Sequence, residues 1–203
     1  MARQARFPAR HGWLVWVAGL LPLAWVVWRG LSGDLGPDPA KALVSHLGWW
    51  GMVWLIVCLT VRPLVQMAGW PRLFPLRRWF GLLAFTWLSL HFLGWAWLLL
   101  GWDAGSIVSE IGKRPYILVG FSAWLLLLPL ALTSTRTARR RLGRRWQVLH
   151  RLIYPAVLLG LLHDFWLQKS GYGEPLLFAA MIVLLLGWRW HHSRQRGGPV
   201  SAA

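Results

Sequence analysis

The sequence predicts an all-α integral membrane protein, built as a bundle of six transmembrane helices. Of its 203 residues, 57% are apolar and only 14% are charged, whereas about a quarter of a soluble domain is charged. Three blocks of about 20 residues, enough to cross a bilayer as a helix, contain no Asp, Glu, Lys or Arg: 42–61, 79–102 and 115–135. This pattern excludes a soluble α/β enzyme and a disordered tail, and the single Cys58 excludes a disulfide scaffold.

Six spans are predicted, at 13–31, 42–61, 79–102, 115–135, 146–168 and 174–190. The first follows basic residues as a signal peptide does, but no small-x-small cleavage site follows Trp28, so we expect a retained helix. The last is short, and we expect Arg189 to snorkel to the surface there. The predicted domains are a tail at 1–12, the six-helix domain at 13–190 and a tail at 191–203.

The basic residues predict that both termini are cytoplasmic. Seventeen of the 22 lie in the two tails and in the second and fourth loops, which share one side, and cytoplasmic segments are enriched in Lys and Arg. The six acids lie on the other side or at its edge: Asp34, Asp38, Asp103, Glu110, Asp164 and Glu174. Because the basic residues lie between apolar blocks rather than on one soluble face, the net charge of +16 does not indicate nucleic-acid binding.

Histidines are the ionisable residues that lie deep in the predicted spans, where such residues are costly and indicate function. His91 lies 12 residues beyond Trp79, near mid-membrane, and His46 lies near the outer end of the second span. His150 and His163 share the fifth span, about 20 Å apart along a helix. Three others are predicted to be solvated surface residues: His11, His191 and His192.

Imidazoles in an apolar helical bundle are the axial ligands that b-type haem requires. Two histidine levels favour one or two haems, with His91, His150 and His163 as iron ligands. By depth, His91 lies between the other two and slightly nearer His163, so we prefer a His91–His163 haem. His150 would then hold a second haem whose other ligand the sequence does not name. For His46, a pairing with His163, a quinone-site role and an interfacial role all stay open.

One geometric feature of the fifth span requires a distorted helix. Thirteen residues leave His150 and His163 about 140° apart around an ideal helix, so they cannot face one neighbour. Pro155 lies between them and removes a backbone donor, so we expect it to distort the helix. The sequence shows no internal repeat.

Five arginines on the predicted cytoplasmic side flank the third and fifth spans: Arg77, Arg78, Arg144, Arg145 and Arg151. They either set the topology and contact anionic lipid, or pair with haem propionates or a flavin phosphate. Because no Gly-x-Gly-x-x-Gly motif occurs, we expect electrons to come from a membrane quinol, a bound flavin or another protein.

Four motifs resemble the MsrQ family, formerly YedZ. They are Arg141-Leu-Gly-Arg-Arg-Trp-Gln-Val-Leu-His-Arg-Leu-Ile-Tyr154, Asp38-Pro-Ala-Lys-Ala-Leu-Val-Ser-His46, Lys113-Arg-Pro-Tyr116 and Leu132-Thr-Ser-Thr135. The resemblance covers roughly residues 12–190, and the chain is more distantly similar to the ferric-reductase-like transmembrane domain of NADPH oxidases. In that superfamily the third and fifth spans each supply two histidines, and here the third span has His91 alone.

The resemblance implies a multi-pass protein of the bacterial inner membrane that binds haem b and FMN. It implies an electron-transfer subunit that passes electrons from the quinone pool to MsrP, a periplasmic molybdopterin reductase that repairs methionine sulfoxide in oxidised proteins. The residues themselves predict only a six-helix, haem-bearing electron conduit with an acidic outer face. The alternatives are a cytochrome b anchor for a different periplasmic oxidoreductase, a small histidine-relay transporter, and a structural assembly factor.

Overall fold

A computed structural model describes residues 12–168 and 171–196, and in these ranges the only regular elements are helices. Six helical segments are long and apolar enough to cross a membrane, which confirms the predicted fold class. The elements are α1 (Gly12–Leu31), α2 (Pro39–Met67), η2 (Pro71–Leu73), α3 (Leu76–Gly94), η3 (Trp95–Leu99), α4 (Ala104–Lys113), α5 (Pro115–Leu132), α6 (Arg136–Leu142), α7 (Arg144–Leu149), η4 (His150–Leu152), α8 (Ile153–Leu167) and α9 (Gly173–Arg196). His11 and most of both predicted tails lie outside the described residues.

The short helices α4 and α6 were not predicted, because each is too short and too polar to resemble a span. Side-chain caps explain both. Asp103 accepts a hydrogen bond from the backbone N–H of Ser106 at the start of α4, and Thr135 does the same for Ala138 at the start of α6. Helix α2 begins at Pro39, three residues before the predicted span at 42–61. Asp38 caps its first turn, and proline is favoured at the first helical position.

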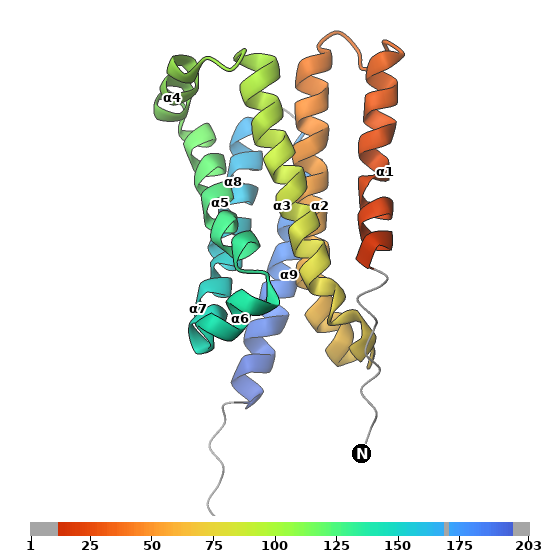
Figure 1. Cartoon of the computed structure of the whole chain (residues 1–203), viewed down its shortest axis with the longest axis vertical. Coiled ribbons are helices and arrows are strands. Elements are labelled where there is room, and N and C mark those ends of the chain that lie inside the picture. The colour runs from red at the N-terminus through yellow and green to blue at the C-terminus, as the bar shows by residue number, and fades with distance from the viewer. Residues whose placement is uncertain (1–11, 169–170, 197–203) are drawn as a thin grey trace, which may run out of the picture.

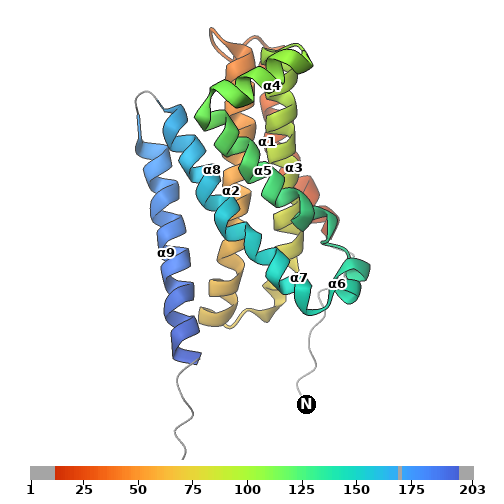
Figure 2. The same ribbon diagram turned by 90° about the vertical axis from the view of Figure 1, so that its left-hand side faces the viewer.

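Two helix pairs form the centre of the bundle, α2 with α3 and α5 with α8. In Figure 1, α1 lies at one edge beside α2 and α3, and α4 lies across one end of the bundle. Helices α6 and α7 lie at the opposite end, where α1 begins and α9 ends; Figure 2 shows α9 along the outside of α8 and α2. We call these ends the α4 end and the α6 end.

The core lies between these pairs, while the outer faces are apolar and exposed. Leu59, Val157 and Ile182 are fully buried in a cluster formed by α2, α3, α5, α8 and α9. Leu21 of α1 and Leu184 of α9 are 62% and 72% exposed. Apolar residues on both the inner and the outer faces are typical of helices surrounded by lipid.

The fifth span is broken where Pro155 requires it. Pro155 cannot donate to the carbonyl four residues earlier, and the chain forms a 3₁₀ turn at His150–Leu152 between α7 and α8. As a result His150 contacts Thr133 at one end of α5, and His163 contacts Tyr116 at the other. Both histidines thus face α5, which an undistorted helix would not allow.

Arg189 differs from the sequence-based expectation. Instead of snorkelling to the surface, its side chain is only 9% exposed and donates hydrogen bonds to α2 and α8. The expectation was wrong because a basic residue near a helix end also stays inside when a neighbouring carbonyl and hydroxyl satisfy its N–H groups.

Candidate functional site

His91 of α3 and His163 of α8 face each other across the centre of the bundle, near the α4 end. Their ring centroids are 6.2 Å apart, and the ring planes make an angle of 76°. The chain therefore brings together the two histidines that depth favoured as partners, although they are 72 residues apart in sequence.

A backbone carbonyl holds each of these two rings. His91 donates from Nδ1 to the Val44 carbonyl of α2 at 2.8 Å, and His163 donates from Nδ1 to the Tyr116 carbonyl of α5 at 2.7 Å. Because a carbonyl oxygen only accepts, Nδ1 carries the proton and Nε2 has a free lone pair in both rings. Among the described residues no hydrogen bond reaches either Nε2. The site therefore presents two nitrogens with free lone pairs, on rings that backbone carbonyls hold in place.

This donor set fits haem iron better than a free metal ion. No group of three or more His, Cys, Asp or Glu side chains able to hold a metal occurs within the described ranges. Haem supplies its own equatorial nitrogens and needs only axial ligands from the protein. With metal–imidazole bonds of about 2 Å, two axial rings have centroids roughly 6 Å apart, which agrees with the observed separation.

Two glycines allow the neighbouring helices to approach the imidazoles. A Cβ at Gly48 would lie 2.9 Å from Nδ1 of His91, and a Cβ at Gly120 would lie 2.7 Å from Nδ1 of His163. Both distances are shorter than real Cβ contacts, so any side chain would displace the ring. Glycine is therefore required for the hydrogen bonds that orient both histidines.

The two halves of this site repeat at a constant spacing. Val44, Gly48 and His91 correspond to Tyr116, Gly120 and His163, each 72 positions later. The α2–α3 pair and the α5–α8 pair thus build equivalent halves. This repeat was not detected in the sequence, because Val44 and Tyr116 contribute backbone carbonyls and their side chains differ. The equal spacing of the Gly and His residues was the one sign of the repeat in these residues.

His46 lies elsewhere. Its Nε2 is 3.2 Å from the Pro22 carbonyl of α1, and its ring contacts Trp25, Trp50 and Trp87. The structure brings His46 together with α1 and an aromatic cluster, and does not bring it together with His163.

His150 has a different environment from the central pair. Its Nε2 is 3.2 Å from Oγ1 of Thr133, whose hydroxyl donates to the Pro129 carbonyl at 2.6 Å. The Thr133 oxygen is therefore the acceptor, Nε2 carries the proton, and the lone pair is on Nδ1. The ring stacks on Trp146 with centroids 3.9 Å apart. Within the described part of the chain, no other histidine ring contacts it.

A cavity of about 720 Å³ opens beside His150 at the α6 end. Six arginines line this arginine-rich cavity: Arg62, Arg77, Arg78, Arg136, Arg139 and Arg151. No Asp or Glu is among its lining residues, so its chemistry favours an anionic ligand. Arg144 and Arg145, predicted from the sequence, do not line it. The sequence interpretation missed Arg62, Arg136 and Arg139, since they come from other elements.

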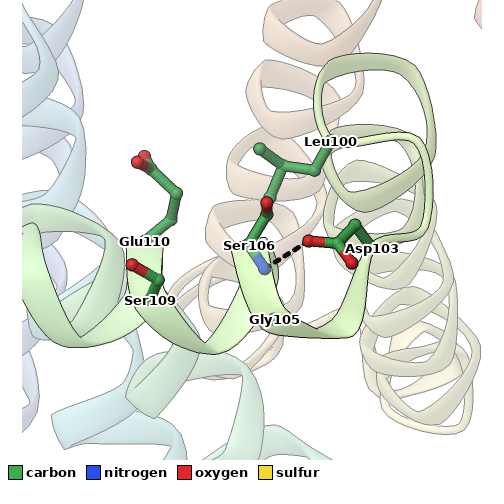
Figure 3. A pocket seen from close by; sticks show the side chains of 6 residues that line it. All are labelled: Leu100, Asp103, Gly105, Ser106, Ser109 and Glu110. Atoms are coloured by element: carbon green, nitrogen blue, oxygen red, sulfur yellow. Dashed lines mark hydrogen bonds between the residues drawn. The ribbon is translucent and has the colours of Figure 1, made fainter.

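The α4 end carries an acidic patch, which we define as Asp103 and Glu110. Figure 3 shows both beside a shallow pocket of about 400 Å³, with Asp103 turned toward Ser106. Hydrogen bonds from the side chain and backbone of Ser106 lower the pKa of Asp103, so this carboxylate stays charged in mildly acidic solution. Glu110 forms an ion pair with Arg114 at 2.5 Å.

Comparisons with known proteins agree with this geometry. Residues 47–161 match the family model described as the ferric reductase like transmembrane component. Proteins named protein-methionine-sulfoxide reductase heme-binding subunit MsrQ are similar: that of Bordetella parapertussis is 47% identical, over 87% of this chain and 86% of its own length. The Rhodospirillum rubrum protein of the same name is 48% identical, over 86% of this chain and 85% of its own length. No solved structure matches.

Proposed function

Because the chain belongs to the MsrQ family of haem-binding subunits, we propose that it carries electrons across a membrane to a methionine-sulfoxide reductase, as its haem-binding subunit. The facing pair His91–His163 is the observation that carries the proposal. Bound between these rings, haem b would supply a one-electron carrier. The chain's own residues orient the two Nε2 atoms, through the Val44 and Tyr116 carbonyls.

The arginine-rich cavity supports a second cofactor contact. Arg77, Arg78 and Arg151 line it, and they are suited to haem propionates or to the phosphate of FMN. A second haem at His150 would need another ligand besides this residue, and ligation through Nε2 would first require that nitrogen to leave Thr133. The family resemblance is what implies FMN.

The charges support an orientation for the bundle, and the proposed electron source and acceptor then give the direction of transfer. We place the arginine-rich α6 end in the cytoplasm of a bacterial inner membrane, by the positive-inside rule. The α4 end, with the His91–His163 pair, then faces the periplasm, where the MsrP-type molybdopterin reductase would accept electrons. The quinone pool is the proposed source.

The test of this function is optical. Detergent-purified protein from haem-replete cells is expected to show the Soret and α bands of low-spin haem b, because two imidazoles are preset for axial ligation. A quinol analogue should reduce these bands, and the purified reductase should reoxidise them. A colourless preparation would contradict the proposal and favour the transporter, whereas a coloured protein inert toward the reductase would favour a different periplasmic partner.

The acidic patch predicts how the reductase docks. We expect it to use a partly basic surface, so reoxidation should slow as salt rises, because charges beyond about 10 Å are screened at 0.1 M. Asp103→Asn and Glu110→Gln, in the patch, should each slow reoxidation at low salt and flatten its salt dependence. Glu174→Gln, in the first turn of α9, should do the same, because Glu174 is another acid on the proposed outer side. Stopped-flow absorbance at the Soret band measures these rates.

Asp34→Asn is the matched control for this experiment. It removes one charge of the proposed outer side in the α1–α2 loop, where Asp34 pairs with Arg29, at the edge of the bundle formed by α1 (Figure 1). If the reoxidation rates are equal in all variants and at every salt concentration, electrostatic docking is ruled out. The proposal that the protein transfers electrons would not be affected.

A further inference from the structure

Arg189 is a buried cation that joins three helices. From α9 it donates to the Leu59 carbonyl of α2 at 2.6 Å and to the hydroxyl of Tyr154 in α8 at 2.8 Å. Its guanidinium also lies 5.6 Å from the centre of the Tyr154 ring. The side chain is 91% buried, which is rare for arginine unless a counter-charge is present.

No carboxylate neutralises this guanidinium in the described parts of the chain. The ion pairs there are Arg29–Asp34 and Arg114–Glu110, and Nε of Arg189 is buried with no hydrogen-bond partner. Burying an unpaired charge is costly. An anion from outside the chain, bound near this guanidinium, would reduce that cost.

Tyr154 connects Arg189 to the arginine-rich cavity. The Tyr154 hydroxyl oxygen accepts a hydrogen bond from Arg189, so its own proton is left to donate elsewhere. Tyr154 lines the cavity, together with Arg77 and Arg151. Arg189 itself does not line the cavity. Because six arginines and no acid do, an anion bound there would be a suitable acceptor for the hydroxyl proton of Tyr154.

We propose that Arg189 and Tyr154 form the inner anion-binding point of this cavity, taking a carboxylate or a phosphate group of a bound redox cofactor. Tyr154 touches the anion, and Arg189 is a positioning residue that orients the hydroxyl and adds positive potential behind it. The proposal rests on the proposed function, since it requires a cofactor in the cavity. It assigns a role to a helix that lies outside the region matched by the ferric reductase family model.

Two sources of the anion, a haem propionate and a phosphate ester, give different results. The full-length protein is purified as wild type and as Arg189→Met, Arg189→Lys and Tyr154→Phe. One arm follows haem reduction against applied potential; the other measures the affinity for added FMN by quenching of flavin fluorescence. Arg194→Met is the matched control, because Arg194 is an exposed arginine of the same helix that lies over Trp190.

If the anion is a propionate, Arg189→Met should lower the midpoint potential of one haem component, because a removed cation disfavours the added electron. Arg189→Lys keeps the charge and should restore most of that shift, and Tyr154→Phe should give a smaller one. If the anion is a phosphate, haem potentials stay unchanged. FMN then binds about tenfold more weakly to Tyr154→Phe, the usual loss of one charge-assisted hydrogen bond.

A purely structural role for Arg189 predicts something else. The variants would then melt at a lower temperature, with both cofactor readouts equal to those of Arg194→Met, and that result overturns the proposal. Should Arg189→Met fail to fold, Tyr154→Phe and Arg189→Lys decide the question. The proposed function fails separately, through loss of the haem spectrum in the wild-type protein.

Discussion

Replacing His91 or His163 with alanine is expected to remove most of the haem from the purified protein. The two rings lie next to each other and each has an Nε2 without a hydrogen bond, so either change would leave a haem bound between them with one histidine ligand. Haem per protein, measured as the pyridine haemochrome, should fall similarly for both variants. The Soret band of the remaining haem should shift from the low-spin to the high-spin position.

The other histidines serve as graded controls for this experiment. His46→Ala and His191→Ala should keep the wild-type spectrum, since His46 bonds the Pro22 carbonyl and His191 is exposed at the α6 end. His150→Ala should leave the central haem in place and remove only a second component, if one exists. Wild-type spectra in both His91→Ala and His163→Ala would refute the ligand assignment, and loss of haem in His46→Ala would favour the His46–His163 pairing.

Adding one methyl group at Gly120 or Gly48 is expected to disturb the same site without touching a ligand. The new Cβ would lie 2.7 or 2.9 Å from Nδ1 of His163 or His91, so the ring must shift away from its carbonyl. Overpacking of this kind costs about 1–3 kcal/mol. We expect both Gly→Ala variants to bind less haem and to show altered axial ligation in their electron paramagnetic resonance spectra.

Gly187→Ala is the matched control for the glycine variants. A Cβ at Gly187, in α9, meets nothing within 4 Å. Alanine also favours a helix over glycine by about 1 kcal/mol, so a weaker helix would not explain haem loss at positions 48 and 120. If Gly48→Ala and Gly120→Ala bind haem as well as Gly187→Ala does, the carbonyl–histidine contacts do not set the ligand geometry.

The sequence by itself determined the six spans and the residues available for chemistry. Uncharged blocks of about 20 residues specify membrane helices because a bilayer leaves a chain few other ways to satisfy its backbone. Histidines at bilayer depth pointed to haem because imidazole is rare there without a function. The depth argument also favoured His91 with His163, since rise per residue is fixed along a helix.

Tertiary structure alone decided how these residues are used. Which helix faces which is a long-range outcome of packing, so the Val44 and Tyr116 carbonyls, the arginines of the cavity and the burial of Arg189 left no local signal. The same holds for His46, which depth placed near His163 but whose helix face directs it toward α1. Spacing along one chain fixes depth in the membrane, whereas rotation about each helix axis is set by the neighbours it packs against.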